Sequence, residues 1–411
     1  MAETRLDNGV RILSEHIAGM RSVALGVWIR QGGAHEPPDQ IGVSHLLEHM
    51  VFKGTEKRSA LEIADALEAL GGGLDAYTSR EHTSYQARVL DEHMPVALDV
   101  LADMVLQPTL HREDLALERE VVLEEIAQVE DTPDDLVFEL HGDRLWGSHP
   151  YGRPILGSTE SVTAMQADTL QELHRSRYVG ENLIVAAAGN VQHDDLVERV
   201  GSYFSDVSSG QRNEIVTPVE TTARGIASVH RDSAQSHIVF GTNTPGHAHA
   251  DRYPLVLISS ALGGGMSSRL FQRVREEMGL CYSIFTFQSF YRSGGLLGVY
   301  VGTRPGTADQ ASDAVREELE RVSREGLGPG GLDRIKRQVS GQVMLSLEST
   351  GPRLHRLASF ALHDQPMRPL DDVLEKIAAV TEDDILRVAG QYVTPAAHFE
   401  LRLGPTPTAA A

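Results

Sequence analysis

The sequence holds a single cysteine, Cys281, in 411 residues. A disulfide within the chain is therefore impossible, and a zinc site built from several thiolates is excluded as well. Any metal ion would have to be held by histidine and carboxylate side chains. We expect Cys281 itself to be a small buried side chain and not a nucleophile.

Basic side chains are scarce relative to acidic ones. The chain has 37 Lys and Arg against 58 Asp and Glu, so its net charge is 37 − 58 = −21. Binding to nucleic acid requires a basic face that neutralises phosphates, and an anionic membrane surface repels an acidic protein. Neither partner is expected, whereas basic peptides are favoured.

Long apolar runs are absent too. Residues 1–9 have no apolar core of the kind found in signal peptides, and no uncharged apolar run approaches about 18 residues, the length of a membrane-spanning helix. We therefore expect a cytoplasmic location. The content of 41% hydrophobic and 23% charged residues is that of a globular protein, and the length allows two to four domains.

Strand and helix patterns alternate along the chain, and their order occurs twice. In the first half, the patterns predict strands within 8–31 and at 74–79, 82–90 and 182–189, and helices at about 40–53, 59–70, 93–106, 112–130 and 133–146. In the second half, they predict strands at 236–242, 281–290 and 295–303, and helices at about 252–262, 267–278, 307–325 and 331–347.

The repeated order predicts two homologous halves of about 200 residues each. Adjacent short strands that look like hairpins favour a mixed α+β fold, with a mostly antiparallel sheet packed against helices in each half. We expect an N-terminal domain at 1–206, a linker rich in Ser, Thr, Gly and Pro at 207–224, and a C-terminal domain at 225–411.

The predicted helix 40–53 carries a metal-binding pattern, His45-Leu46-Leu47-Glu48-His49. Positions i and i+4 share one helix face, so both imidazoles can reach a single ion, while Glu48 lies close enough to act on a metal-bound water without being a ligand. The arrangement follows the logic of the HExxH helix, with the acid on the other side of the pair. Chance places such a pattern in roughly one chain of this composition in nine, so a surface helix remains an alternative.

A catalytic zinc site uses three protein ligands, and the acidic helix at 112–130 can supply the third. Glu118 and Glu125 are two helical turns apart and share a face, from which Glu124 points about 100° away. If Glu125 is the ligand, Glu118 can hydrogen-bond a ligand histidine or the water. The alternative is a solvated acidic face, as most Glu-rich helices have.

These segments, together with Ala76-Tyr77-Thr78-Ser79-Arg80-Glu81-His82-Thr83, resemble the inverzincin peptidases, the family of pitrilysin and mitochondrial processing peptidase. In that family the third ligand follows the second histidine by about 76 residues, which is the separation of Glu125 from His49. The resemblance implies that His45, His49 and Glu125 bind one zinc ion per chain, that Glu48 is the general base, and that Glu118 supports the site.

The resemblance covers nearly the whole chain and is to the short bacterial, processing-peptidase-like branch. It implies that substrate pairs with the edge strand at Ala76, Tyr77 and Thr78, where the small Ala76 allows a close approach. His82 stands where many relatives have Asn; it is expected either to donate a hydrogen bond near the site or to be an exposed strand residue.

The second half holds Gly263-Gly264-Gly265-Met266-Ser267-Ser268, and Arg275 and Tyr282 follow it. No Gly-Lys-Ser/Thr is present there, which excludes a phosphate loop, and a helix stop is the simpler interpretation of the glycines. In the resembling family, an Arg and a Tyr seven residues apart bind the substrate carbonyl near the scissile bond. Arg275 and Tyr282 match that spacing, and a cation and a phenol can both donate to an oxyanion.

The resemblance thus implies a zinc-dependent endopeptidase that binds peptides or unfolded segments as an extended strand. Zinc would activate a water, and Glu48 would take its proton and pass it to the leaving amine. One chain holds both elements, as in the homodimeric bacterial type that it resembles, and this resemblance implies a clamshell homodimer whose active site is shared between subunits. A non-catalytic structural subunit of the same fold and a small-molecule metallohydrolase are the alternatives.

Overall fold

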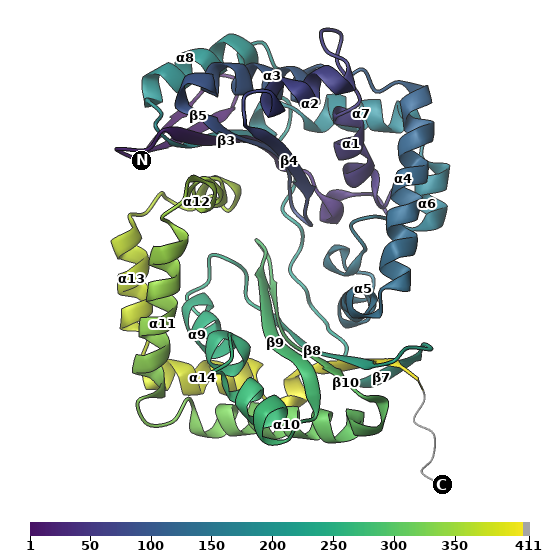
Figure 1. Ribbon diagram of the computed structural model, residues 1–411, viewed down its shortest axis with the longest axis vertical. Coiled ribbons are helices and arrows are strands. Elements are labelled where there is room, and N and C mark those ends of the chain that lie inside the picture. Colours follow the sequence, from purple (N-terminus) through teal and green to yellow (C-terminus); the bar gives the residue numbers. More distant parts are fainter. Residues whose placement is uncertain (406–411) are drawn as a thin grey trace. The chain divides into compact units, whose positions relative to one another are not determined.

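The computed structural model describes residues 1–405, and its chain divides into two compact units (Figure 1). Unit 1 consists of Met1–Ala127, Arg153–Glu214 and Ser346–Met367. Unit 2 consists of Gln128–Gly152, Ile215–Leu345 and Arg368–Ala411. The boundary at Glu214 lies within the predicted linker 207–224, but each unit also takes one segment from the other half of the sequence.

Unit 1 is built on a six-stranded sheet of order β1-β2-β6-β3-β5-β4. β2 and β6 are parallel, and the other neighbours are antiparallel. The strands are β1 Ala2–Arg5, β2 Arg11–His16, β3 Ser22–Ile29, β4 Gly73–Thr78, β5 Thr83–Leu90 and β6 Leu183–Gly189. Its helices are α1 Val43–Val51, α2 Ala60–Glu68, α3 Met94–Leu106, α4 Arg112–Asp131, α6 Thr159–Ala164, α7 Ala167–Arg177, α8 His193–Phe204 and α12 Thr350–Leu362. The last four residues of α4 belong to unit 2.

Unit 2 has a five-stranded sheet of order β7-β11-β8-β10-β9. Its strands are β7 Gly225–His230, β8 Ser236–Thr244, β9 Cys281–Phe290, β10 Gly295–Thr303 and β11 Phe399–Gly404. Its helices are α5 Pro133–Trp146, α9 Arg252–Gly263, α10 Ala308–Glu325, α11 Gly331–Ser346, α13 Leu370–Ala379 and α14 Glu382–Tyr392, together with a π-helix at Phe271–Glu277. Like β2 and β6, the strands β7 and β11 are parallel, and every following pair is antiparallel.

Apart from the additional edge strand β1 in unit 1, the two sheets therefore share one topology, which confirms the predicted α+β fold of two homologous halves. The predicted hairpin strands at 74–79 and 82–90 are β4 and β5, and those at 281–290 and 295–303 are β9 and β10. The predicted helix at 59–70 is α2, and it begins with a capping box: Ser59 accepts a hydrogen bond from the Glu62 N–H, and its own N–H donates to the Glu62 carboxylate. No helix within residues 1–405 is both long and apolar enough to cross a membrane.

Successive side chains of β3 point to opposite faces of the sheet, and each face has its own core. Val23, Leu25 and Val27 lie in the core that contains α1 and α3, whereas Ala24 and Trp28 lie in a second core with the apolar side of α12. α12 therefore covers the face of the unit 1 sheet that lies away from α1.

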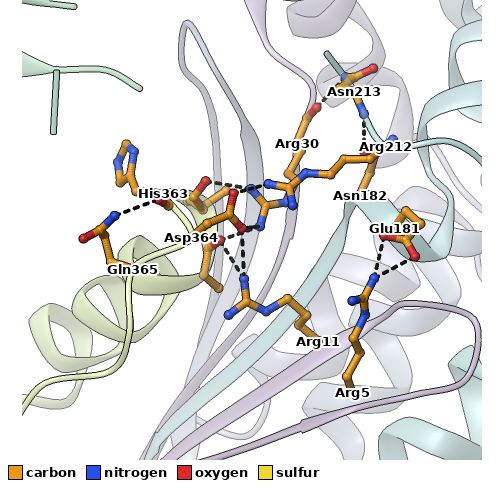
Figure 2. Close-up of polar contacts among 12 residues, drawn as sticks. Arg5, Arg11, Arg30, Glu181, Asn182, Arg212, Asn213, His363, Asp364 and Gln365 are labelled. Carbon is orange, nitrogen blue, oxygen red and sulfur yellow. Dashed lines mark hydrogen bonds and ion pairs between the residues drawn. The ribbon is translucent and has the colours of Figure 1, made fainter. Parts of the chain in front are cut away.

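Arginine side chains fix the C-terminal end of α12 on the sheet (Figure 2). Arg30, at the end of β3 and only 6% exposed, donates to the last carbonyls of α12 and to Asp364, 3.1 Å away. Arg11 and Arg212 also pair with Asp364. Cations at a helix C-terminus satisfy the free carbonyls and oppose the helix dipole, so this cluster holds α12 in place.

Candidate metal centre

Helix α1 places two imidazoles side by side. Val43, Leu46, Leu47 and Met50 are fully buried in the core of unit 1 and fix the rotation of the helix. This rotation leaves His45 and His49 on the side toward α4, with ring centres 4.6 Å apart, as their i, i+4 spacing predicts.

The N-terminus of α1 is held by a buried carboxylate. The N–H groups of Gly42 and Ser44 each donate to Glu36 at 2.8 Å. Burial raises the pKa of Glu36 to about 7, although these two hydrogen bonds act in the opposite direction. A carboxylate at this end of a helix satisfies free N–H groups and so stabilises the turn that carries His45.

Helix α4 brings a carboxylate to the two rings. The Glu125 oxygens lie 3.6 Å from Nε2 of His45 and 3.7 Å from Nε2 of His49. These three side chains form a group whose candidate ligand atoms all lie within 4.8 Å of one another. Zinc bonds of 2.0–2.2 Å at tetrahedral angles would place ligand atoms about 3.4 Å apart, so the donor set and its spacing fit a zinc ion.

Burial also favours the metal-binding form of the first histidine. The pKa of His45 is lowered to about 4 by burial and, to a smaller extent, by the neighbouring His49. The imidazole is therefore neutral near pH 7, as a metal ligand must be.

Glu118 contacts His49 at Nδ1, the ring nitrogen that does not face Glu125. Its Oε2 lies 3.0 Å from Nδ1 of His49, and its Oε1 lies 2.5 Å from Nζ of Lys53. Glu118 is only 6% exposed, so this pairing is shielded from water. A carboxylate on the far nitrogen fixes the tautomer and orientation of a ligand histidine, so that Nε2 faces the metal position.

Glu48 is 8% exposed and lies near enough to His49 and Glu125 for both to act on its pKa. Its Oε2 accepts a hydrogen bond of 2.6 Å from the hydroxyl of Thr78, while Oε1 has no hydrogen-bond partner in residues 1–405. Burial raises the pKa of Glu48 above its ordinary value, and the Thr78 hydroxyl and His49 partly oppose this rise. One oxygen is thus held in place and the other is free to take up a proton.

The β4–β5 hairpin carries four of the six residues predicted to bind substrate: Ala76, Tyr77, Thr78 and His82. β4 is the edge strand of its sheet, and Ala76 packs partly against the core that contains α1. Nε2 of His82 lies 3.2 Å from the hydroxyl of Tyr77, and its Nδ1 lies 3.0 Å from that of Ser79. Burial lowers the pKa of His82 to about 3, so this ring is a neutral part of the hairpin turn.

Arg275 and Tyr282 belong to unit 2 and are close to each other. The Arg275 guanidinium lies 5.3 Å from the centre of the Tyr282 ring and 4.5 Å from that of Phe271. Tyr282 is 77% exposed, so its hydroxyl is accessible to a ligand. Cys281 is half-buried, and burial raises the pKa of its thiol to about 11, which does not suit a nucleophile.

Sequence patterns missed two partners of the site. Lys53 follows His49 by four residues, so helical spacing alone could have placed it near Glu118. The hydrogen bond from Thr78 to Glu48 depends on how β4 packs against α1, so no local sequence pattern predicts it.

Comparisons with known sequences give matches over most of the chain. Residues 11–159 match the insulinase family (peptidase family M16), and residues 164–339 match the peptidase M16 inactive domain. An uncharacterized zinc protease of Streptomyces coelicolor, SCO5738, is 39% identical over 94% of this chain and 86% of its own length. The uncharacterized zinc protease YmxG of Bacillus subtilis is 38% identical over 94% of each chain.

Solved structures share the fold as well. A protease from Helicobacter pylori superposes with a TM-score of 0.90 over 98% of this chain and 99% of that chain, at 21% identity. A peptidase M16 inactive domain from Pseudomonas fluorescens gives the same score over 100% and 99%, at 19% identity.

Proposed function

Because this chain belongs to the insulinase family, peptidase family M16, we propose that it is a zinc-dependent endopeptidase that cleaves peptides or unfolded segments. The observation that carries the proposal is that candidate ligand atoms of His45, His49 and Glu125 lie within 4.8 Å of one another. Glu48 is close enough to His49 and Glu125 to interact with them electrostatically. Hydrolytic zinc sites typically combine histidine and carboxylate ligands with a nearby carboxylate that does not bind the metal.

In this proposal, zinc bound by the three ligands would polarise the peptide carbonyl and activate a water molecule. Glu48 takes the proton of that water at its free Oε1 and later delivers it to the leaving amine. Glu118 keeps Nε2 of His49 directed at the metal through its bond to Nδ1. Arg275 and Tyr282 donate to the developing oxyanion.

We further propose that the substrate adds to the free edge of β4 as an extended strand. Pairing between main chains binds many sequences, which suits an endopeptidase of broad specificity. Ala76 leaves room for the substrate backbone, and Tyr77 and His82 line the hairpin that it would follow. An assembly of two chains with a shared active site is part of the same proposal.

A non-catalytic structural subunit of this fold is the second candidate. It is supported by the match of residues 164–339 to the M16 inactive domain. The intact group of His45, His49 and Glu125 argues against it, because a scaffold has no need of three converging metal ligands.

The deciding experiment compares the wild type with Glu48→Gln. Zinc content is measured on the purified proteins, and cleavage of an unstructured peptide library is followed by mass spectrometry. We expect Glu48→Gln to keep its zinc and to lose at least about a hundredfold in turnover, because it cannot take up the proton. A wild type that binds zinc but cleaves no peptide would support the scaffold.

A further inference from the structure

We infer that Thr78 is a positioning residue for the reaction, which fixes the carboxylate of Glu48 relative to the strand that receives the substrate. The inference rests on the proposed function and adds a residue whose part in the reaction is to orient the base. Its basis is the hydrogen bond of 2.6 Å from the Thr78 hydroxyl to Oε2 of Glu48.

The two sides of β4 have different tasks. Leu74 and Ala76 pack against the core that contains α1, and Thr78 follows on the same face because alternate residues of a strand share a face. Tyr77 points to the other face, where its ring centre lies 6.1 Å from that of His355 on α12. The hydroxyl of Thr78 therefore reaches Glu48 from the metal side of the strand that is proposed to bind substrate.

Thr78 is itself held by its neighbours. It is paired with Thr83 across the β4–β5 hairpin, and the two hydroxyl oxygens lie 3.4 Å apart. Thr83 is fully buried and donates to the carbonyl of Gln31 at 2.9 Å, and the Gln31 amide donates to Ser44 at 3.0 Å. Ser44 precedes His45 on α1, so these bonds link the hairpin to the helix that carries the metal ligands.

Threonine suits this task for a stereochemical reason. A β-branched side chain in a strand is restricted at χ1, so its hydroxyl points in a defined direction. With Oε2 of Glu48 occupied by this donor, Oε1 is the oxygen left for proton transfer. Without the donor, the carboxylate can rotate, and the fraction of bound substrates that meet a correctly oriented base falls.

The mechanism predicts a loss in the chemical step and not in binding. Valine carries a methyl group where threonine has its hydroxyl, so Thr78→Val keeps the shape of the side chain and removes the hydrogen bond to Glu48, together with the longer 3.4 Å polar contact to Thr83. We expect its kcat to fall about 10- to 100-fold, while KM changes less than about twofold and zinc content stays at the wild-type level. Thr78→Ser restores the donor and should bring kcat back to within about threefold of the wild type.

Thr55→Val is the matched control. Thr55 is also a buried threonine of unit 1, and its hydroxyl donates to a carboxylate, that of Asp103, at 2.7 Å. Its removal should lower the melting temperature while kcat stays unchanged, so it separates a loss of stability from a loss of catalysis.

The inference is overturned if Thr78→Val keeps the kcat of the wild type, if Thr78→Ser fails to rescue it, or if Thr55→Val loses as much kcat. Glu48→Gln, assayed in parallel, keeps the two proposals apart. An active Glu48→Gln refutes the proposed base and the inference together. An inactive Glu48→Gln with a fully active Thr78→Val refutes the inference alone.

Discussion

Replacement of Glu118 by glutamine tests the support of the metal site without touching a ligand. In the wild type, Oε2 of Glu118 lies 3.0 Å from Nδ1 of His49. Glutamine has nearly the same size and an oxygen that can still accept a hydrogen bond from Nδ1, but it lacks the negative charge. Loss of such an outer partner typically weakens metal binding 10- to 100-fold, which corresponds to about 1.4–2.7 kcal/mol.

Glu118→Gln should change the free energy of unfolding less than it changes the free energy of zinc binding. Lys53 loses its partner in Glu118→Gln, but its side chain is 33% exposed and can turn toward water. We therefore expect the free energy of unfolding of the metal-free protein to fall by less than about 1 kcal/mol. A large loss of zinc affinity with a small loss of stability would mark a role in metal binding.

The assay is competition for zinc against a chromophoric chelator at fixed pH and ionic strength. Glu124→Gln provides the control, because Glu124 is exposed on the same helix and makes the same change of charge. The reasoning is refuted if Glu118→Gln binds zinc within twofold of the wild type, or if Glu124→Gln weakens it equally.

Contacts elsewhere in the two units lead to further measurable outcomes. Arg30→Met removes the donor that holds the end of α12 and should lower the free energy of unfolding in urea by about 2–4 kcal/mol; a loss below about 0.5 kcal/mol would contradict this. Burial lowers the pKa of His141 and of His398 to about 4, so below pH 6.5 the unfolded chain binds more protons than the folded one. In urea titrations of the metal-free protein, the free energy of unfolding should therefore be lower at pH 5 than at pH 7, by up to about 1.4 kcal/mol per histidine and pH unit. Equal free energies of unfolding at the two pH values would contradict this prediction. If the active site is shared between two subunits, mixing Glu48→Gln with Arg275→Ala should restore about a quarter of the wild-type activity, and no recovery would argue for separate sites.

Local patterns in the sequence were sufficient to predict most of the helices and strands that carry the site. The spacing of apolar residues predicts α1, and the capping box at Ser59 predicts the start of α2, because both depend on neighbours within a few residues. The elements after 347 were not predicted. α12 and β11 draw their stability from partners far away in the sequence, as in the parallel pairing of β11 with β7.

The site shows the same division between local and distant information. The i, i+4 spacing was enough to place His45 and His49 on one face of a helix. Glu125 could be assigned only through the family resemblance, because 76 residues separate it from His49. The bond from Thr78 to Glu48 depends on the packing of β4 beside α1, which no periodicity encodes.

The most direct test of the account is the zinc content of the wild type and of Glu125→Ala, each measured after exhaustive dialysis against a known concentration of free zinc. We expect one zinc per wild-type chain and a large loss of zinc from Glu125→Ala, with both proteins folded by circular dichroism. A folded Glu125→Ala that retains one zinc at wild-type affinity would contradict the assignment of His45, His49 and Glu125 as the ligand set.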